Sequence, residues 1–168
     1  EIVAIPVTET GSFIASDGTK LKAQKEDTVT YVEVKDVPAM GFETIHFEVE
    51  AAEKEAAVFT MSANHIETPF YVMDLNEYGQ MTRLYDKENE REVIREGERA
   101  NVLQIFEDKP LDNEAWDIDI FYQQKMREVT ELTKIEVTEC GNLRAVLHME
   151  WKFDASVIKQ DMIFYAND

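Results

Sequence analysis

The chain has 168 residues, a length typical of one ordinary domain or of a large domain with a small appendage. Thirty-five Asp and Glu stand against seventeen Lys and Arg, and the net charge of −18 makes nucleic acid and anionic membrane surfaces poor partners. No run approaches the ~18 apolar residues of a membrane span. Residues 1–4 lack a signal-peptide pattern and Cys140 is the only cysteine, which together favour a cytoplasmic location. The missing initiator Met suggests a fragment or a processed product.

Short alternating segments dominate the first third of the chain. Residues 2–7 form an apolar run interrupted by a proline, which is typical of an edge strand, and residues 16–19 (Ser-Asp-Gly-Thr) are a hairpin turn signal. Residues 28–34 and 42–49 alternate and predict two strands. Residues 51–57 contain only Ala, Glu and Lys and are either one helical turn or a charged loop. They mark the expected boundary between a small β region, 1–57, and a main domain, 58–168.

Strand signals restart after this boundary. Residues 58–61, 70–75 and 80–85 predict strands, and so do residues 131–138, 143–153 and 157–165. Residues 76–79 and 139–142 predict turns. Residues 86–99 contain good helix formers but only two apolar residues, too few for an amphipathic helix, so we predict a charged hairpin tip. In no stretch of ten or more residues do apolar side chains recur with the 3.6-residue period of an α-helix. The sequence therefore predicts a mainly β fold, an antiparallel β-sandwich of two stacked sheets.

The stretch 101–122 is the most distinctive part of the sequence. It begins as a strand, breaks into a loop at Lys109-Pro110 and carries six acids between Glu107 and Asp119, with Trp116 among them. The apolar pattern resumes at residues 118–122 and predicts a second strand after the loop. A tryptophan ringed by carboxylates can grip a sugar, because the ring covers a C–H face and the acids accept from hydroxyls. Alternatively, Trp116 fills the end of a sandwich and the acids form a solvated rim. These residues leave both interpretations open and show no complete catalytic site.

Three histidines are each followed two residues later by an acid, and on a strand such pairs share a face. They could offer metal-ligand couples, but an acid at that offset is unremarkable in so acidic a chain, so we favour solvated strand faces. We expect Trp151 and four strand-borne methionines to be core residues: Met61, Met73, Met81 and Met162.

Several segments, taken in order, resemble the large C-terminal β-domain of glycoside hydrolase family 38 α-mannosidases. Residues 71–88 are similar to its opening strand–turn–strand. Residues 91–94, 97–98 and 101–110 continue the pattern, and residues 115–118 (Ala-Trp-Asp-Ile) are similar to its Asp-Ala-Trp-Asp segment. Residues 37–42 and 156–160 extend the resemblance, which covers essentially the whole chain.

The resemblance implies a sandwich of the galactose mutarotase-like supersandwich type, incomplete in this chain, with residues 58–168 as its first part. Family members are retaining α-mannosidases whose zinc ion is held by two His and two Asp of an N-terminal domain. The resemblance therefore implies that this chain alone is inactive and has no cofactor of its own. Its expected partners are the catalytic domain of the same polypeptide and α-mannosides, contacted or braced through Asp108, Trp116 and Asp117.

Two competing hypotheses are a free-standing carbohydrate-binding β-sandwich and a purely structural module. Both remain open from the sequence, and they differ in whether the isolated chain binds glycans. An incomplete sandwich would also leave an exposed sheet edge that invites self-association.

Overall fold

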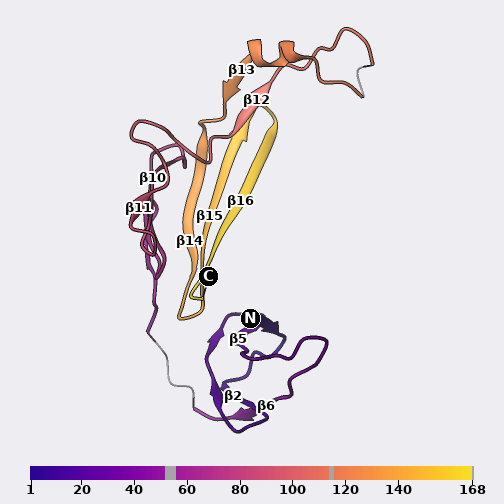
Figure 1. Cartoon of the computed structure of the whole chain (residues 1–168). Helices are drawn as coiled ribbons and strands as arrows, with labels where there is room; N and C mark the ends of the chain where they lie inside the picture. The colour runs from indigo at the N-terminus through magenta and orange to yellow at the C-terminus, as the bar shows by residue number, and fades with distance from the viewer. Residues whose placement is uncertain (52–55, 114–115, 168) are drawn as a thin grey trace.

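The computed structural model describes residues 1–51, 56–113 and 116–167, and Figure 1 shows how its strands are arranged. The described residues form antiparallel sheets and a single turn of 3-10 helix, so the predicted mainly β sandwich is confirmed. Residues 52–55, which are part of the predicted boundary segment 51–57, lie outside the described part of the chain. None of the helices in the described residues is long and apolar enough to cross a membrane.

The N-terminal unit consists of two small three-stranded sheets. One has the order β1-β5-β4 and the other β3-β2-β6. The bounds are β1 Ile2–Ile5, β2 Gly11–Ala15, β3 Lys20–Leu21, β4 Ala23–Lys25, β5 Thr30–Glu33 and β6 Ile45–Val49. The core of this unit is Phe13, Val32 and Val34, and the rings of Phe13 and Phe47 lie 5.0 Å apart. The turn predicted at residues 16–19 is confirmed, with Gly18 at φ +86°, a conformation that suits glycine.

The main unit is a sandwich of a five-stranded and a three-stranded sheet. The first has the order β11-β10-β9-β8-β7, with β7 Thr60–Met61, β8 His65–Glu67, β9 Tyr71–Leu75, β10 Met81–Asp86 and β11 Arg91–Glu92. The second has the order β14-β15-β16, with β14 Leu132–Cys140, β15 Arg144–Phe153 and β16 Ser156–Tyr165. Because side chains alternate along a strand, one face of β15 is buried and lies between the sheets.

The core between these two sheets contains side chains from both. Ile66, Met73 and Leu75 come from the five-stranded sheet and meet Leu147, Met149, Trp151 and Met162 of the other. Trp151 is 1% exposed, and its indole N–H donates to the Tyr78 carbonyl at 2.8 Å. Its ring also explains Gly79, at φ +74°, because a Cβ there would lie 2.7 Å from the ring. The predicted core positions of Trp151 and the four methionines are confirmed, with Met61 and Met81 packed at the margin.

A two-stranded ribbon extends from the sandwich at the top of Figure 1. It pairs β12 (Gln104–Phe106) with β13 (Met126–Glu128), and a 3-10 helix, η1 (Ile120–Gln124), precedes β13. The sequence predicted a resumed strand pattern at residues 118–122, and this was wrong for 120–122, because a short apolar run is compatible with either conformation. Cys140 and Glu139, expected in a turn, instead end β14, and the turn follows them.

A buried glutamine joins the two units where the N-terminal unit meets the β14–β15 turn. The Gln24 Oε1 accepts from the backbone N–H groups of Leu143 and Arg144, at 2.9 and 2.8 Å, and its Nε2 donates to the Arg144 carbonyl at 2.9 Å. A Cβ on Gly141 would overlap the Gln24 amide, so glycine is required for this approach. Arg144 also lies over the ring of Tyr31, 4.4 Å from its centroid. We call this contact the Gln24 joint.

Candidate functional site

The acidic loop predicted from the sequence joins β12 to β13, and two lysines close its base. The Glu107 backbone N–H donates to the Lys125 carbonyl at 3.0 Å. The Glu107 carboxylate pairs with the ammonium groups of Lys109 and Lys125, the latter at 2.7 Å. Hydrogen bonds from Lys109, and then from Lys125, lower the Glu107 pKa to about 2. Glu107 is therefore a fixed anion that clamps the two ends of the loop together.

Backbone hydrogen bonds shape the far side of this loop. Asn113 has a positive φ of 57°, which asparagine tolerates better than most residues. Its carbonyl accepts from the N–H groups of Trp116 and Asp117, at 2.8 and 3.2 Å. The Asp119 carboxylate accepts from the Leu111 N–H at 2.8 Å. These bonds fold the loop into a turn on which the Trp116 and Asp117 side chains project outward.

The three sequence-predicted site residues are all exposed. Trp116 has 89% of its surface exposed, so it does not fill the end of the sandwich, and that alternative is wrong. Asp108 and Asp117 are also exposed and lie on the same loop. Ala115 and Glu114, which precede Trp116 in the predicted motif, lie outside the described residues.

Exposed apolar side chains gather on this loop and on the ribbon that carries it. We call this set the apolar end, and its members are Phe106, Leu111, Trp116, Ile118, Ile120, Phe121 and Met126. One edge-on ring contact, Phe106 against Tyr122 at 5.1 Å, holds η1 against β12. Large exposed apolar surfaces on soluble proteins mark interaction sites. The sequence signal for this surface is the apolar run at 118–122, whose pattern predicts a strand.

A polar network fixes the direction in which the ribbon leaves the sandwich. The Arg99 guanidinium donates to both carboxylate oxygens of Glu128 in β13, each at 2.9 Å. The Gln80 side chain, 1% exposed, donates to Glu128 at 3.0 Å and accepts from Arg99 at 2.6 Å. These hydrogen bonds lower the pKa of Glu128 and raise that of Arg99. Sequence reasoning missed this network, because its members lie up to 48 residues apart.

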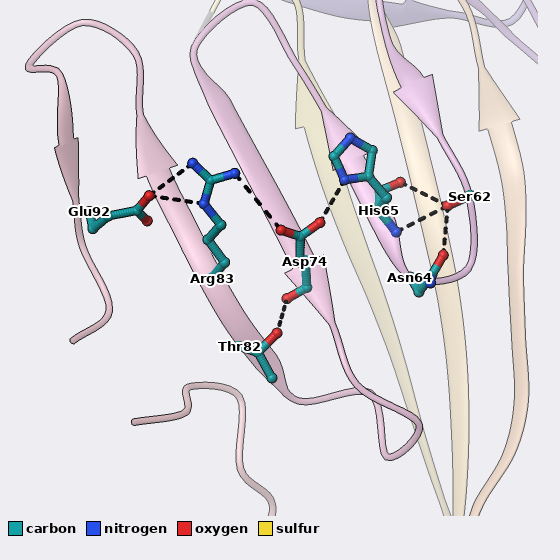
Figure 2. Close-up of polar contacts among 7 residues, drawn as sticks. All are labelled: Ser62, Asn64, His65, Asp74, Thr82, Arg83 and Glu92. Carbon is teal, nitrogen blue, oxygen red and sulfur yellow. Dashed lines mark hydrogen bonds and ion pairs between the residues drawn. The ribbon is translucent and has the colours of Figure 1, made fainter. Parts of the chain in front are cut away.

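A second row of polar side chains crosses the outer face of the five-stranded sheet, with members on four adjacent strands (Figure 2). The His65 Nδ1 lies 2.6 Å from the Asp74 carboxylate, directly across the β8–β9 pair. Arg83 contacts Asp74 at 4.0 Å and binds Glu92 at 2.8 Å. The hydrogen bond from Arg83 to Glu92 raises the pKa of Arg83. Each charged group here has a partner of opposite sign, which suits a solvated face of a sheet.

The outer face of the three-stranded sheet repeats this arrangement around His148. Its Nδ1 lies 2.6 Å from Asp161 and its Nε2 lies 3.0 Å from Glu150. These two carboxylates, Glu150 first, raise the His148 pKa. Glu150 also pairs with Lys159 at 3.1 Å. Within the described residues no group of three or more His, Cys, Asp or Glu is placed to hold a metal ion.

A cleft of about 560 Å³ lies beside the Gln24 joint, between the N-terminal unit and the end of β14. Glu26 and Glu139 line it, and burial followed by the charges of Glu26 and Asp161 raises the Glu139 pKa. None of the sequence-predicted site residues lines this cleft.

Comparisons with known proteins concern mainly the sandwich. A family model described as "Glycosyl hydrolases family 38 C-terminal domain" matches residues 66–168. A solved structure described as an alpha-mannosidase from Enterococcus faecalis V583 is similar with a TM-score of 0.56 and 12% sequence identity. The match covers 96% of this chain and 24% of that chain, and at this identity it shows the fold alone. The chain thus spans about a quarter of the solved chain's length. No curated protein matches.

Proposed function

Because the chain belongs to the family of glycosyl hydrolase family 38 C-terminal domains, we propose that it is a non-catalytic portion of a retaining, zinc-dependent α-mannosidase that hydrolyses terminal α-mannosides. In that enzyme it packs against the catalytic domain of the same polypeptide and lines the rim of the active site. The family assignment was the central expectation from the sequence, and the family model confirms it.

The observation that carries the packing role is the apolar end. Its exposed Trp, Phe, Leu, Ile and Met side chains are of the kinds that interfaces bury at their centres. The charged groups nearest its base are paired within the chain, because Glu107 binds two lysines. A partner can therefore cover this surface without leaving the Glu107 carboxylate unpaired.

At the rim, we assign different tasks to the three predicted residues. The exposed Trp116 ring offers a flat apolar face to the C–H side of a sugar or to a side chain of the catalytic domain. Asp108 and Asp117 offer acceptors to sugar hydroxyls or to backbone N–H groups. The Asn113 carbonyl fixes the backbone of residues 116 and 117, so the ring and the Asp117 carboxylate are presented together.

The chemical step belongs to the catalytic domain in this proposal. Retaining hydrolysis needs a nucleophile and an acid/base carboxyl group roughly 5 Å apart, and zinc supplies Lewis-acid stabilisation and orientation of the sugar. In the part of the chain that the structure describes, no group of three or more His, Cys, Asp or Glu is placed to hold a zinc ion. We therefore place the zinc ligands outside this chain.

Hydrolysis of an aryl α-mannoside by this chain and by a polypeptide that includes the catalytic domain tests the proposal. We expect activity only in the longer polypeptide, and we expect a chelator to abolish it and added zinc to restore it. Absence of activity in both would refute the mannosidase assignment.

Variants of the longer polypeptide separate contact with substrate from bracing of the fold. If Trp116 touches the sugar, Trp116→Ala raises KM by about tenfold, the effect of losing one aromatic–sugar contact. If Asp117 braces the loop, Asp117→Ala lowers the melting temperature instead. Phe42→Ala is the matched control, because Phe42 is an exposed aromatic residue of the N-terminal unit.

The exposure of Trp116 also supports a second candidate, a free-standing carbohydrate-binding module. This candidate predicts that the isolated chain binds methyl α-mannoside in a calorimetric titration and that Trp116→Ala abolishes the heat. The mannosidase proposal predicts no measurable binding by the isolated chain.

A further inference from the structure

Three consecutive residues hold the chain where the β12–β13 ribbon leaves the sandwich. Arg99 binds Glu128 of β13 through two hydrogen bonds. Ala100 and Met81 exchange two backbone hydrogen bonds, of 3.0 and 2.9 Å, which tie this segment to the start of β10. Asn101 adds contacts through its side chain, and β12 begins three residues later. The direction of the ribbon is therefore set at residues 99–101.

The side chain of Asn101 is bonded to both sheets of the sandwich. Its Nδ2 donates to the Gly79 carbonyl at 3.1 Å, in the turn between β9 and β10, and to Oε1 of Gln160 in β16 at 3.0 Å. Its Oδ1 accepts from Nε2 of Gln160, also at 3.0 Å. The two amides thus form a reciprocal pair. Because Gly79 joins strands of the five-stranded sheet and Gln160 belongs to the three-stranded sheet, one side chain fixes the start of the ribbon relative to both.

The backbone conformation alone does not account for an asparagine at position 101. Its φ of 53° lies in the left-handed region, which asparagine tolerates better than most residues and which glycine adopts freely. A glycine would therefore satisfy the backbone, but it could make none of the three side-chain hydrogen bonds. What the asparagine adds at this position is the connection to the two sheets.

The place of the Trp116 loop depends on the angle at which the ribbon leaves the sandwich. Figure 1 shows that the ribbon extends away from the sandwich, with η1 at its far end, and the loop lies beyond β12. Because five extended residues span at most ~17 Å, a tilt of about 10° at residue 101 would move the end of β12 by ~3 Å. A misplacement of about 1 Å is enough to cost a binding or reacting group much of its effect. A small change at residue 101 is therefore large at the loop.

We infer that Asn101 and Gln160 are positioning residues for the contact between Trp116 and the sugar. Neither touches the sugar: their amide pair fixes the angle of the ribbon, and hence the place of the indole ring against the substrate. This inference rests on the proposed function, in the form in which Trp116 contacts the sugar. A contact made equally with the bound substrate and with the transition state changes KM and leaves kcat unchanged. Loss of the amide pair therefore raises KM, and it does so through Trp116.

Steady-state kinetics of the polypeptide that includes the catalytic domain, with an aryl α-mannoside, test the inference. Asn101→Gly keeps the backbone conformation and removes the amide, and Gln160→Ala removes the same pair without altering position 101. We expect each variant to raise KM by about three- to tenfold and to leave kcat unchanged. In the double variant Asn101→Gly/Trp116→Ala we expect the KM of Trp116→Ala alone, because the ring that the amide pair positions is already absent.

Asn89→Ala is the matched control, because the Asn89 amide donates to Asp86 within the hairpin that follows β10, at 2.7 Å. It leaves KM unchanged. A purely structural role of Asn101 would instead reduce the amount of folded enzyme, which lowers kcat and leaves KM unchanged, and this result overturns the inference. If Trp116→Ala raises KM but Asn101→Gly does not, or if the two increases multiply in the double variant, the inference alone is overturned. If Trp116→Ala leaves KM unchanged, the sugar contact is refuted, and the inference falls with it.

Discussion

At the scale of single residues, His148 links the stability of the sandwich to pH. Its two carboxylate partners, Glu150 and Asp161, favour the imidazolium and raise its pKa above the usual 6.5. A pKa raised in the folded state adds stability that is fully present below the unfolded-state pKa and is lost as the pH rises through the folded-state value. The stabilisation from His148 is thus largest in mildly acidic solution.

The replacement His148→Gln tests this direction. We expect the variant to be less stable than the wild type at pH 6, and the difference to shrink as the pH is raised, because the wild-type imidazolium loses its proton. Urea unfolding at increasing pH measures it. His46→Gln, at an exposed histidine of β6, serves as the matched control. A difference that grew with pH would contradict the assignment.

Gly141 and Gln24 offer a second test at the scale of residues, because the Gln24 amide occupies the space that a side chain at position 141 would need. We expect Gly141→Ala to destabilise the chain by about 1–3 kcal/mol through overpacking. Gln24→Ala removes three bonds to the β14–β15 turn and costs about 1–3 kcal/mol for the unsatisfied backbone groups.

The double variant Gln24→Ala/Gly141→Ala gives the sharper result. The added methyl group then enters the space left by the glutamine, so the two losses do not add. Thermal unfolding of the wild type, the two single variants and the double variant completes a double-mutant cycle. Additive losses would show that the two residues do not share the joint.

At the scale of elements, the Arg99–Glu128 pair determines how the β12–β13 ribbon presents the apolar end. Arg99→Met leaves the Gln80 side chain, which is buried, without one of its donors. We expect the melting temperature to fall by roughly 2–4 °C. We also expect the backbone amide hydrogens of the β12–β13 ribbon to exchange faster with solvent, as measured by hydrogen–deuterium exchange. Arg95→Met, at an exposed arginine of the same segment between β11 and β12, is the matched control and leaves the melting temperature and the exchange rates unchanged.

Local signals were enough to predict most of the strands. The strand predicted from alternation at residues 28–34 is β5, and the turn predicted at residues 76–79 separates β9 from β10. Both predictions succeed because they depend only on neighbours in the sequence. The short strands β3 and β4 were not predicted, since two or three residues carry no period. The Gln24 joint could not have been predicted either, because its partners lie about 120 residues away. For the site, the sequence identified the Trp116 loop, but neither its exposure nor the apolar surface around it.

At the scale of the whole molecule, the two hydrophobic cores are separate and meet through polar contacts at the Gln24 joint. We therefore expect two unfolding transitions. Phe13→Ala, in the N-terminal core, costs about 3–5 kcal/mol in the first, and Ile66→Ala, in the sandwich core, costs about 2–5 kcal/mol in the second.

Two optical signals resolve these transitions. Tryptophan fluorescence reports only the main unit, which contains both Trp116 and Trp151, whereas far-UV circular dichroism reports both units. Phe13→Ala leaves the fluorescence midpoint in place, and Ile66→Ala lowers it. A single shared midpoint in all three proteins would show one cooperative unit, and it would count against the predicted boundary at residues 51–57.

The Gln24 joint also has a consequence for how this sequence can diverge. Because a side chain at position 141 and a glutamine amide at position 24 compete for the same volume, substitutions at the two positions are constrained to occur together. Homologues that retain the glutamine are expected to keep glycine at 141, and those with a larger residue at 141 to carry a shorter one at 24. This pair then forms a covariation signal across some 120 residues of sequence, and it marks which homologues hold their N-terminal unit in the same orientation.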